Sequence, residues 1–146
     1  MDTNLPTELY WMTLSVAMTA IFFVPYVVYK ILKTGLWNTL KTPDPEYHPN
    51  AEWASRAKRA HNNAVENLVV FCPLVLAVVF LGKQNEITAM ASMIFFYARL
   101  THSVVYIADI PAIRTLAFFA GFLVQMTLCD LPFTAQALTS HESLPQ

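Results

Sequence analysis

The stretch Arg59-Ala-His-Asn-Asn-Ala-Val-Glu66, with the uncharged run Asn67-Leu-Val-Val-Phe-Cys-Pro-Leu-Val-Leu-Ala-Val-Val-Phe-Leu-Gly82 that follows it, decides the fold of this chain. A continuous apolar run of this length fits a helix that crosses a lipid bilayer. The polar stretch then lies at or just inside a membrane boundary. Ionisable side chains are costly in such a place, so they indicate a functional site.

The polar residues of this stretch are predicted to share one helical face. At about 100° per residue, Arg59, Asn63 and Glu66 fall close together around the helix axis. Asn62 lies at the flank of this face, whereas His61 is turned away from it. The face formed by the first three residues is therefore the first candidate for binding a ligand.

Composition places the chain among membrane proteins. Of its 146 residues 55% are hydrophobic and the mean hydropathy is +0.42, which is too apolar for an ordinary soluble domain. The net charge is −1 and Lys and Arg total 9, so the chain lacks the basic surface typical of nucleic-acid binding. Cys72 and Cys129 stand alone in apolar runs and predict neither a disulfide framework nor a CxxC redox pair.

Four apolar stretches predict an all-α fold, namely an integral membrane four-helix bundle with left-handed up-and-down topology in a single domain over residues 1–146. The expected spans are residues 8–33, 54–81, 87–108 and 113–137. The first run lacks the basic start of a cleavable signal peptide, so we expect it to be retained as a span. Short turns between the later spans make them antiparallel neighbours.

Prolines and one long connection mark the irregular parts of the chain. Pro25 lies inside the first span and predicts a bend near its Lys30 end, and Pro73 predicts an interruption of the second span. Residues 34–55 are rich in helix breakers and predict a long connection that lies along the membrane surface. The fourth apolar run is expected to stop at Asp130-Leu-Pro132.

The distribution of basic residues predicts the orientation in the membrane. With four spans, the first and third connections lie on one side, and the termini and the second connection lie on the other. The basic residues on the first side are Lys30, Lys33, Lys41, Arg56, Lys58, Arg59 and Arg114. Only Lys83 lies on the other side. By the positive-inside rule, the first and third connections face the cytoplasm.

The third span carries a second polar face near its end. Arg99, His102, Tyr106 and Asp109 follow one another at i, i+3, i+7 and i+10, and therefore share one side of a helix. Arg114 opens the fourth span at a similar depth. These groups lie in the same half of the membrane as the polar stretch of the second span. We expect them to point inward and to form a site between helices.

The residue types favour a small zwitterionic ligand. Arginines bind carboxylates in bidentate fashion, a glutamate pairs with an ammonium group, and Asn and Tyr add directional hydrogen bonds. The alternative is structural, with Arg59, Glu66 and Arg99 only neutralising one another between helices. Arg114 opposes the dipole of the helix that it opens, which favours a role facing an anion over a role in capping.

Haem binding is a second alternative. His61 and His102 lie at similar depth, and four-helix membrane bundles hold haem between pairs of histidines. His61 points away from the polar face of its helix, so a simple hydrogen bond is the competing interpretation. No Cys/His cluster or HxxxH spacing predicts a metal site, and no GxSxG, Walker or GxGxxG pattern is present.

Taken together, three motifs resemble those of one family. They are Arg59-Ala-His-Asn-Asn63-x-x-Glu66, then Arg99-x-x-His102-x-x-x-Tyr106, then Arg114 at the start of the fourth span. In this order, and with four spans, they resemble the MAPEG family, the membrane-associated proteins in eicosanoid and glutathione metabolism. The resemblance implies a homotrimer of four-helix bundles with glutathione bound between subunits on the cytoplasmic side. The chain resembles a bacterial-type member of the family, which implies a location in the bacterial inner (cell) membrane.

The resemblance also assigns roles to residues. The positions that match those holding the glutathione backbone are Arg59, Asn63, Glu66, His102 and Tyr106, and Asn62 and Arg99 complete the expected glutathione-binding set. Arg114 matches the arginine beside the sulfur, and Thr115 could offer it a hydroxyl group. The implied role of Arg114 is to stabilise a thiolate, whose thiol has an ordinary pKa of about 8.5.

The implied function is that of a membrane-bound glutathione transferase acting on lipophilic electrophiles, with peroxidase activity left open beside it. The alternative is a non-catalytic or haem-binding membrane module. This chain departs from the family pattern at two positions. Asn62 stands where many eukaryotic members carry another arginine, and Phe118 stands where some members carry a tyrosine.

Overall fold

The computed structural model describes residues 5–41 and 49–142, with residues 131–142 described by their backbone alone. Within these ranges every regular element is a helix. The helices are α1 (Thr7–Ile21), α2 (Val24–Thr34), α3 (Leu36–Lys41), α4 (Glu52–Phe80), α5 (Glu86–Ile107) and α6 (Pro111–Glu142). The predicted all-α class is confirmed.

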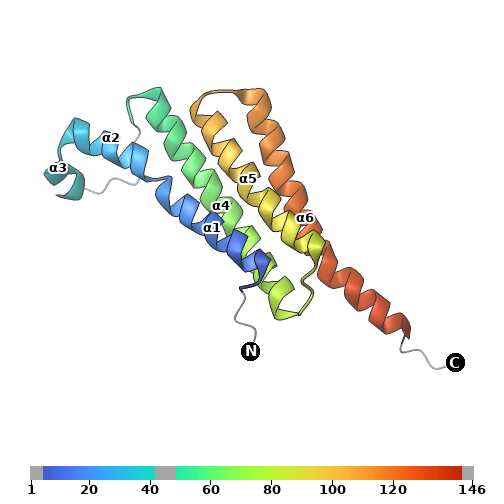
Figure 1. Ribbon diagram of the computed structural model, residues 1–146. Helices are drawn as coiled ribbons and strands as arrows, with labels where there is room; N and C mark the ends of the chain where they lie inside the picture. Colours follow the sequence, from blue (N-terminus) through green and yellow to red (C-terminus); the bar gives the residue numbers. More distant parts are fainter. Residues whose placement is uncertain (1–4, 42–48, 143–146) are drawn as a thin grey trace.

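The described residues contain 4 stretches that are long and apolar enough to cross a membrane: Thr7–Thr34, Glu52–Phe80, Glu86–Ile107 and Pro111–Asp130. The first comprises α1 and α2 together. Figure 1 shows α1, α4, α5 and α6 packed side by side with successive spans running in opposite directions. These findings confirm an all-helical, membrane-capable protein. The left-handed sense of the bundle and its assembly into a trimer stay predictions.

The first span is broken in its middle. The helix is interrupted at Phe22 and Phe23, and Pro25 lies in the first turn of α2. The expected bend near Lys30 is therefore wrong. Proline lacks an amide hydrogen and its ring crowds the carbonyl of the residue four positions earlier. That residue is Ile21, the last of α1, so the distortion falls on the N-terminal side of the proline.

A further expectation is corrected at Pro73. Pro73 does not interrupt the second span, because α4 continues through it from Glu52 to Phe80. The fourth apolar span ends at Asp130 among the described residues, whereas its helix continues to Glu142. A proline inside a helix removes one backbone hydrogen bond, and the hydrogen bonds on both sides of it keep the helix intact in an apolar setting. In Figure 1 the C-terminal part of α6 projects beyond the bundle.

The predicted connection over residues 34–55 contains a short helix, α3 (Leu36–Lys41), which follows directly after Gly35. The φ of Gly35 is 83°, a value that glycine adopts without strain. Residues 42–48 of this connection lie outside the described residues. At the other end of the bundle, Asn85 caps α5 through a reciprocal pair of hydrogen bonds with Thr88.

The core lies where α4, α5 and α6 meet. Phe71 of α4 stacks on Phe95 of α5 with ring centroids 3.7 Å apart, and Leu128 of α6 is fully buried in the same cluster. Nearer the start of α4, the buried side is made of alanines: Ala54, Ala57, Ala60 and Ala64. Small side chains let neighbouring helices approach closely, which is typical of membrane helix pairs.

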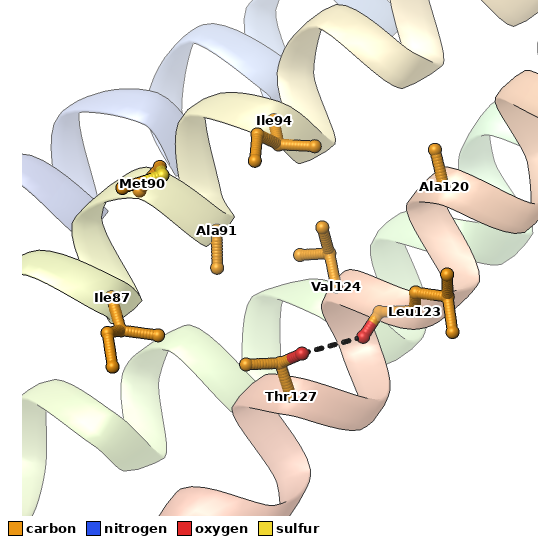
Figure 2. A pocket seen from close by; sticks show the side chains of 8 residues that line it. All are labelled: Ile87, Met90, Ala91, Ile94, Ala120, Leu123, Val124 and Thr127. Carbon is orange, nitrogen blue, oxygen red and sulfur yellow. Dashed lines mark hydrogen bonds between the residues drawn. The ribbon is translucent and has the colours of Figure 1, made fainter.

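An apolar groove of about 470 Å³ lies between α5 and α6 (Figure 2). Its lining residues are Ile87, Met90, Ala91, Ile94, Ala120, Leu123, Val124 and Thr127. The hydroxyl of Thr127 donates to the carbonyl of Leu123 at 3.0 Å, so even this polar side chain is satisfied within α6. The groove therefore offers a ligand apolar surface and no charge.

Candidate functional site

The polar residues named by the sequence lie at one end of the bundle. The start of α4, the end of α5 and the start of α6 meet there (Figure 1). Arg56 of α4 ties them together, because its Nε donates to the carbonyl of Ile107 at 2.9 Å and its Nη1 lies 3.7 Å from the carboxylate of Asp109. Asp109 has a φ of 61°, as the tight turn into α6 requires.

A pocket of about 320 Å³ opens between α5 and α6 at this end. Its lining residues are His102, Tyr106, Arg114, Thr115 and Phe118. The first four were predicted as site residues from the sequence, and Phe118 was noted as a departure from the family pattern. The structure thus brings these predicted residues of two helices into one pocket of a single chain.

Arg114 and Tyr106 form the most closely packed pair of this pocket. The guanidinium carbon of Arg114 lies 4.7 Å from the centre of the Tyr106 ring, a distance at which a cation and an aromatic ring attract each other. The imidazole of His102 lies 5.6 Å from the same ring and 6.3 Å from that of Phe118. The pocket therefore presents a cation and a phenol to any group that enters it.

Thr115 is less available than the sequence suggests. Its hydroxyl donates to the carbonyl of Pro111 at 3.0 Å, within its own helix. The hydroxyl oxygen still has lone pairs, but its one hydrogen is in use. Donating to a sulfur in the pocket would require Thr115 to break this bond.

Arg99 lies beside the pocket and is not among its lining residues. Its side chain is 2% exposed, and its Nη2 donates to the carbonyls of Ala117 at 3.2 Å and Phe118 at 3.0 Å. The guanidinium carbon lies 5.5 Å from the centre of the Phe95 ring and 5.6 Å from that of Phe118. Arg99 is therefore held between α5 and α6 by the protein itself.

The polar face of α4 is arranged differently. Arg59, Asn62 and Glu66 are exposed and Asn63 is half-buried, because the opposite side of α4 is used for packing. Between the described residues, no hydrogen bond or ion pair joins Arg59 to Glu66 or to Arg99. The expectation of an inward-pointing face is therefore wrong for α4 within a single chain, whereas Arg99 and His102 of α5 are buried between helices.

A smaller hollow of about 200 Å³ lies against the α4 face. Its lining residues are Pro49, Ser55, Lys58, Arg59 and Asn62. Two basic side chains at one hollow favour a negatively charged group such as a carboxylate. The α4 face thus has the chemistry for binding an anionic group.

The two histidines do not form a pair. His61 of α4 shares a hydrogen bond of 2.9 Å with the hydroxyl of Tyr26 of α2, whereas His102 packs against Tyr106 and Phe118. The simple hydrogen bond expected for His61 as the alternative to haem ligation is therefore present. Among the described residues there is also no group of 3 or more His, Cys, Asp or Glu side chains that could hold a metal ion.

Sequence reasoning missed Gly121, which bears on this site. A Cβ placed on Gly121 would lie 2.7 Å from Cζ and 2.8 Å from Nε of Arg99, closer than real carbon atoms come. The sequence held a signal for it, because Gly121 is one of only 3 glycines in the chain and lies in an apolar helix rather than at a turn. A glycine in such a place often marks a close approach of another group.

Comparison with known proteins adds a family and several relatives. The model of the MAPEG family matches residues 9–133. The chain is 31% identical over 94 residues to a prostaglandin E synthase of Equus caballus, covering 64% of this chain and 56% of the relative. It is 35% identical over 78 residues to a microsomal glutathione S-transferase 1 of Mus musculus, covering 53% of this chain and 50% of the relative. The chain thus spans about half the length of these curated relatives.

Proposed function

Because the chain belongs to the MAPEG family, we propose that it is a membrane-bound glutathione transferase that joins the glutathione thiolate to lipophilic electrophiles. Relatives named as microsomal glutathione S-transferase 1 support glutathione as the co-substrate. Peroxidase activity with the same thiolate is a further proposal.

The observation that carries this proposal is the pair of Arg114 and Tyr106 in the pocket between α5 and α6. A guanidinium held 4.7 Å from the ring of Tyr106 is a fixed cation at the place where a thiol can lose its proton. A nearby cation lowers the pKa of a thiol from its ordinary value of about 8.5 and so raises the fraction of thiolate at neutral pH. The phenol can donate a further hydrogen bond to the sulfur.

The reaction then follows from ordinary nucleophilic chemistry. The glutathione thiol releases its proton to solvent, and the sulfur lone pair attacks the electrophilic carbon. A carbon–sulfur bond forms while the leaving group departs with its bonding electrons, or while an activated double bond accepts them. Arg114 contributes to the rate by stabilising the negative charge of the thiolate, which is the reactive form of the thiol. The electrophile arrives from the bilayer, in which the apolar part of the molecule lies.

The residues of the α4 face fit the rest of glutathione. The tripeptide has two carboxylates and one ammonium group, and Arg59 and Glu66 carry the complementary charges. Asn63 adds hydrogen-bonding groups of both kinds. Because this face points away from the bundle of its own chain, we propose that a second chain closes the site, as in a homotrimer.

Self-association can be measured directly. The mass of the purified protein in mild detergent at micromolar concentration is expected to be that of three chains. A mass of one chain under these conditions would contradict the shared site, and it would leave the α4 face without a second wall.

We also propose an orientation with the polar end in the cytoplasm, which for a bacterial protein means an inner-membrane location. The support is the excess of Lys and Arg on that side. A single cysteine introduced at Lys41, in a variant without Cys72 and Cys129, should react with a membrane-impermeant maleimide only after the membrane is opened. Reaction in intact cells would reverse the orientation.

Spectroscopy separates this function from its alternatives. Addition of glutathione to the purified protein should produce the absorbance of a thiolate near 240 nm, and an activated aryl halide should then be consumed with a matching loss of thiol. A haem protein would instead be coloured and would show a Soret band. If neither the thiolate absorbance nor the Soret band is observed, the protein is a non-catalytic membrane module and the transferase proposal fails.

A further inference from the structure

Arg99 is the largest side chain buried in the bundle, and it carries a charge. No carboxylate of the described residues pairs with it, and its hydrogen bonds go to the backbone carbonyls of Ala117 and Phe118. A buried cation without a counter-ion costs stability, and an apolar side chain of similar volume would pack the same helices more favourably. Its presence in a membrane-spanning helix therefore calls for a role beyond packing.

The position of the Arg99 guanidinium is defined by Gly121 as well as by its hydrogen bonds to Ala117 and Phe118. A methyl group on Gly121 would overlap the guanidinium, with its carbon 2.7 Å from Cζ. The absence of a side chain at Gly121 is thus what lets Arg99 approach the backbone of α6. Arg99 and Gly121 form a fitted pair across the two helices, which we name the Arg99–Gly121 contact.

The two carbonyls that Arg99 binds lie one helical turn from Arg114. Ala117 and Phe118 follow Arg114 by three and four residues, so their carbonyls lie on the next turn of α6. An α-helix transmits a fixed displacement or rotation over one turn with little loss, because each backbone group is hydrogen-bonded to its neighbours. Fixing these two carbonyls against α5 therefore fixes where Arg114 lies relative to Tyr106, which belongs to α5.

We infer that Arg99 is a positioning residue, which acts on bound glutathione through α6 by holding Arg114 against Tyr106, and not by touching the ligand. This replaces the direct contact that the sequence predicts for Arg99. The side chain is 2% exposed, and its Nη2 donates to two carbonyls of α6. Its Nε and Nη1 are buried without a hydrogen-bond partner among the described residues, and Arg99 is not among the residues that line the pocket. The inference rests on the proposed function for its kinetic consequences, but the contact itself can be tested without any activity.

The kinetic test uses Arg99→Met and Gly121→Ala, which break the contact from opposite sides. Both variants should lower turnover about tenfold, because a shift of the Arg114 guanidinium by about 1 Å is enough to reduce the rate by this order or more. The apparent KM for glutathione should change by less than about threefold. The pH of half-maximal thiolate absorbance should rise by about one unit, since a displaced Arg114 stabilises the thiolate less.

Two further variants make the test specific. Arg99→Lys keeps the charge but loses the planar fork, so its turnover should lie between those of the wild type and Arg99→Met. Ser103→Ala is the matched control, because the Ser103 hydroxyl is buried one turn along α5 and has no hydrogen-bond partner among the described residues. It should leave turnover and the thiolate titration unchanged. A raised KM with normal turnover in Arg99→Met would show direct ligand contact and overturn the inference.

Thermal stability tests the contact independently of catalysis. The double variant Arg99→Met, Gly121→Ala should be about as stable as Arg99→Met alone, because removal of the guanidinium leaves room for the added methyl group. If the losses of the single variants simply add, the two residues do not share a contact and the inference fails. Should Gly121→Ala not fold, the double variant compared with Arg99→Met still decides the matter. A wild type without thiolate signal or turnover would refute the proposed function while leaving this stability test intact.

Discussion

The polar face of α4 and the pocket between α5 and α6 lie at the same end of the molecule but are built in different ways. In the pocket, Arg114, Tyr106 and His102 are brought together by two helices of the same chain. On α4, Arg59 and Glu66 extend from one helix into open space. One chain therefore assembles the part of the proposed site that would act on the sulfur. The part that would hold the remainder of glutathione needs a second surface.

The difference arises because the buried sides of α4 and α5 carry different kinds of side chain. The buried side of α4 near this end consists of alanines such as Ala57, Ala60 and Ala64, so its long polar side chains must point outward. On α5 the buried side itself contains Arg99 and His102. Burial of Arg99 is possible because α6 offers backbone carbonyls and a glycine opposite it, and His102 packs against the rings of Tyr106 and Phe118. The same sequence signal, a polar face on an apolar helix, thus has two structural outcomes.

The largest effect is expected from Arg114→Ala in the pocket. Removing the cation should lower turnover by about 10²-fold or more, because one charge-stabilising group is typically worth this much in the transition state. The affinity for glutathione should fall much less, since Arg114 does not lie on the α4 face. Steady-state kinetics and titration of the thiolate absorbance measure the two quantities separately.

Lys83→Ala, which removes a basic side chain at the other end of the bundle, is the control for Arg114→Ala and should behave like the wild type. Normal turnover in Arg114→Ala would contradict the role assigned to the pocket. Activation of the sulfur would then fall to Tyr106 or Thr115.

Glu66→Gln should have the opposite kinetic signature. Its carboxylate is proposed to pair with the ammonium of glutathione equally in the ground state and the transition state, so its loss should raise the apparent KM about tenfold. Turnover at saturation should stay within about twofold of the wild type. Glu86→Gln, an exposed glutamate at the other end of the bundle, is the matched control. If Glu66→Gln lowers turnover and leaves KM unchanged, the assignment of ligand binding to the α4 face and of catalysis to the pocket is wrong.

Asn62→Arg should strengthen the α4 face. It adds a cation beside a hollow already lined by Lys58 and Arg59. Exposed charge pairs contribute at most about 1 kcal/mol, so the apparent KM for glutathione should fall by no more than about fivefold. The effect should weaken at high salt. Asn62→Gln, which adds length without charge, should leave KM unchanged, and an equal gain in both variants would rule out an electrostatic cause.

Tyr26→Phe should have the smallest effect, because it lies outside both regions. It removes the hydroxyl that shares a hydrogen bond of 2.9 Å with His61, which should lower stability by about 1 kcal/mol or less. Turnover and KM should not change. Thermal unfolding in detergent, with Tyr97→Phe at an exposed position of α5 as the control, measures this loss. A change in kinetics would place His61 in the site after all.

Much of the fold followed from the sequence because the membrane leaves a chain few choices. A long uncharged run can satisfy its backbone in lipid only as a helix, so spans could be read from composition alone. The break of the first span was misplaced because the effect of Pro25 falls on the carbonyl of Ile21, four residues earlier. The apolar part of the fourth span ends at Asp130, but the helix continues to Glu142, because a charged residue limits an apolar span without ending the helix.

The sequence by itself determined which residues could carry the chemistry, because residue type and helical spacing put Arg59, Asn63 and Glu66 on one side of α4 and set Arg114 at a depth similar to that of the polar face of α5. Only the tertiary structure decided where these faces point. Helical periodicity fixes angles around one axis, whereas the rotation of each helix toward its neighbours depends on how all their side chains pack. For the same reason only the structure paired Arg99 with Gly121, since the fit of a guanidinium against a bare backbone requires the two helices to lie in register.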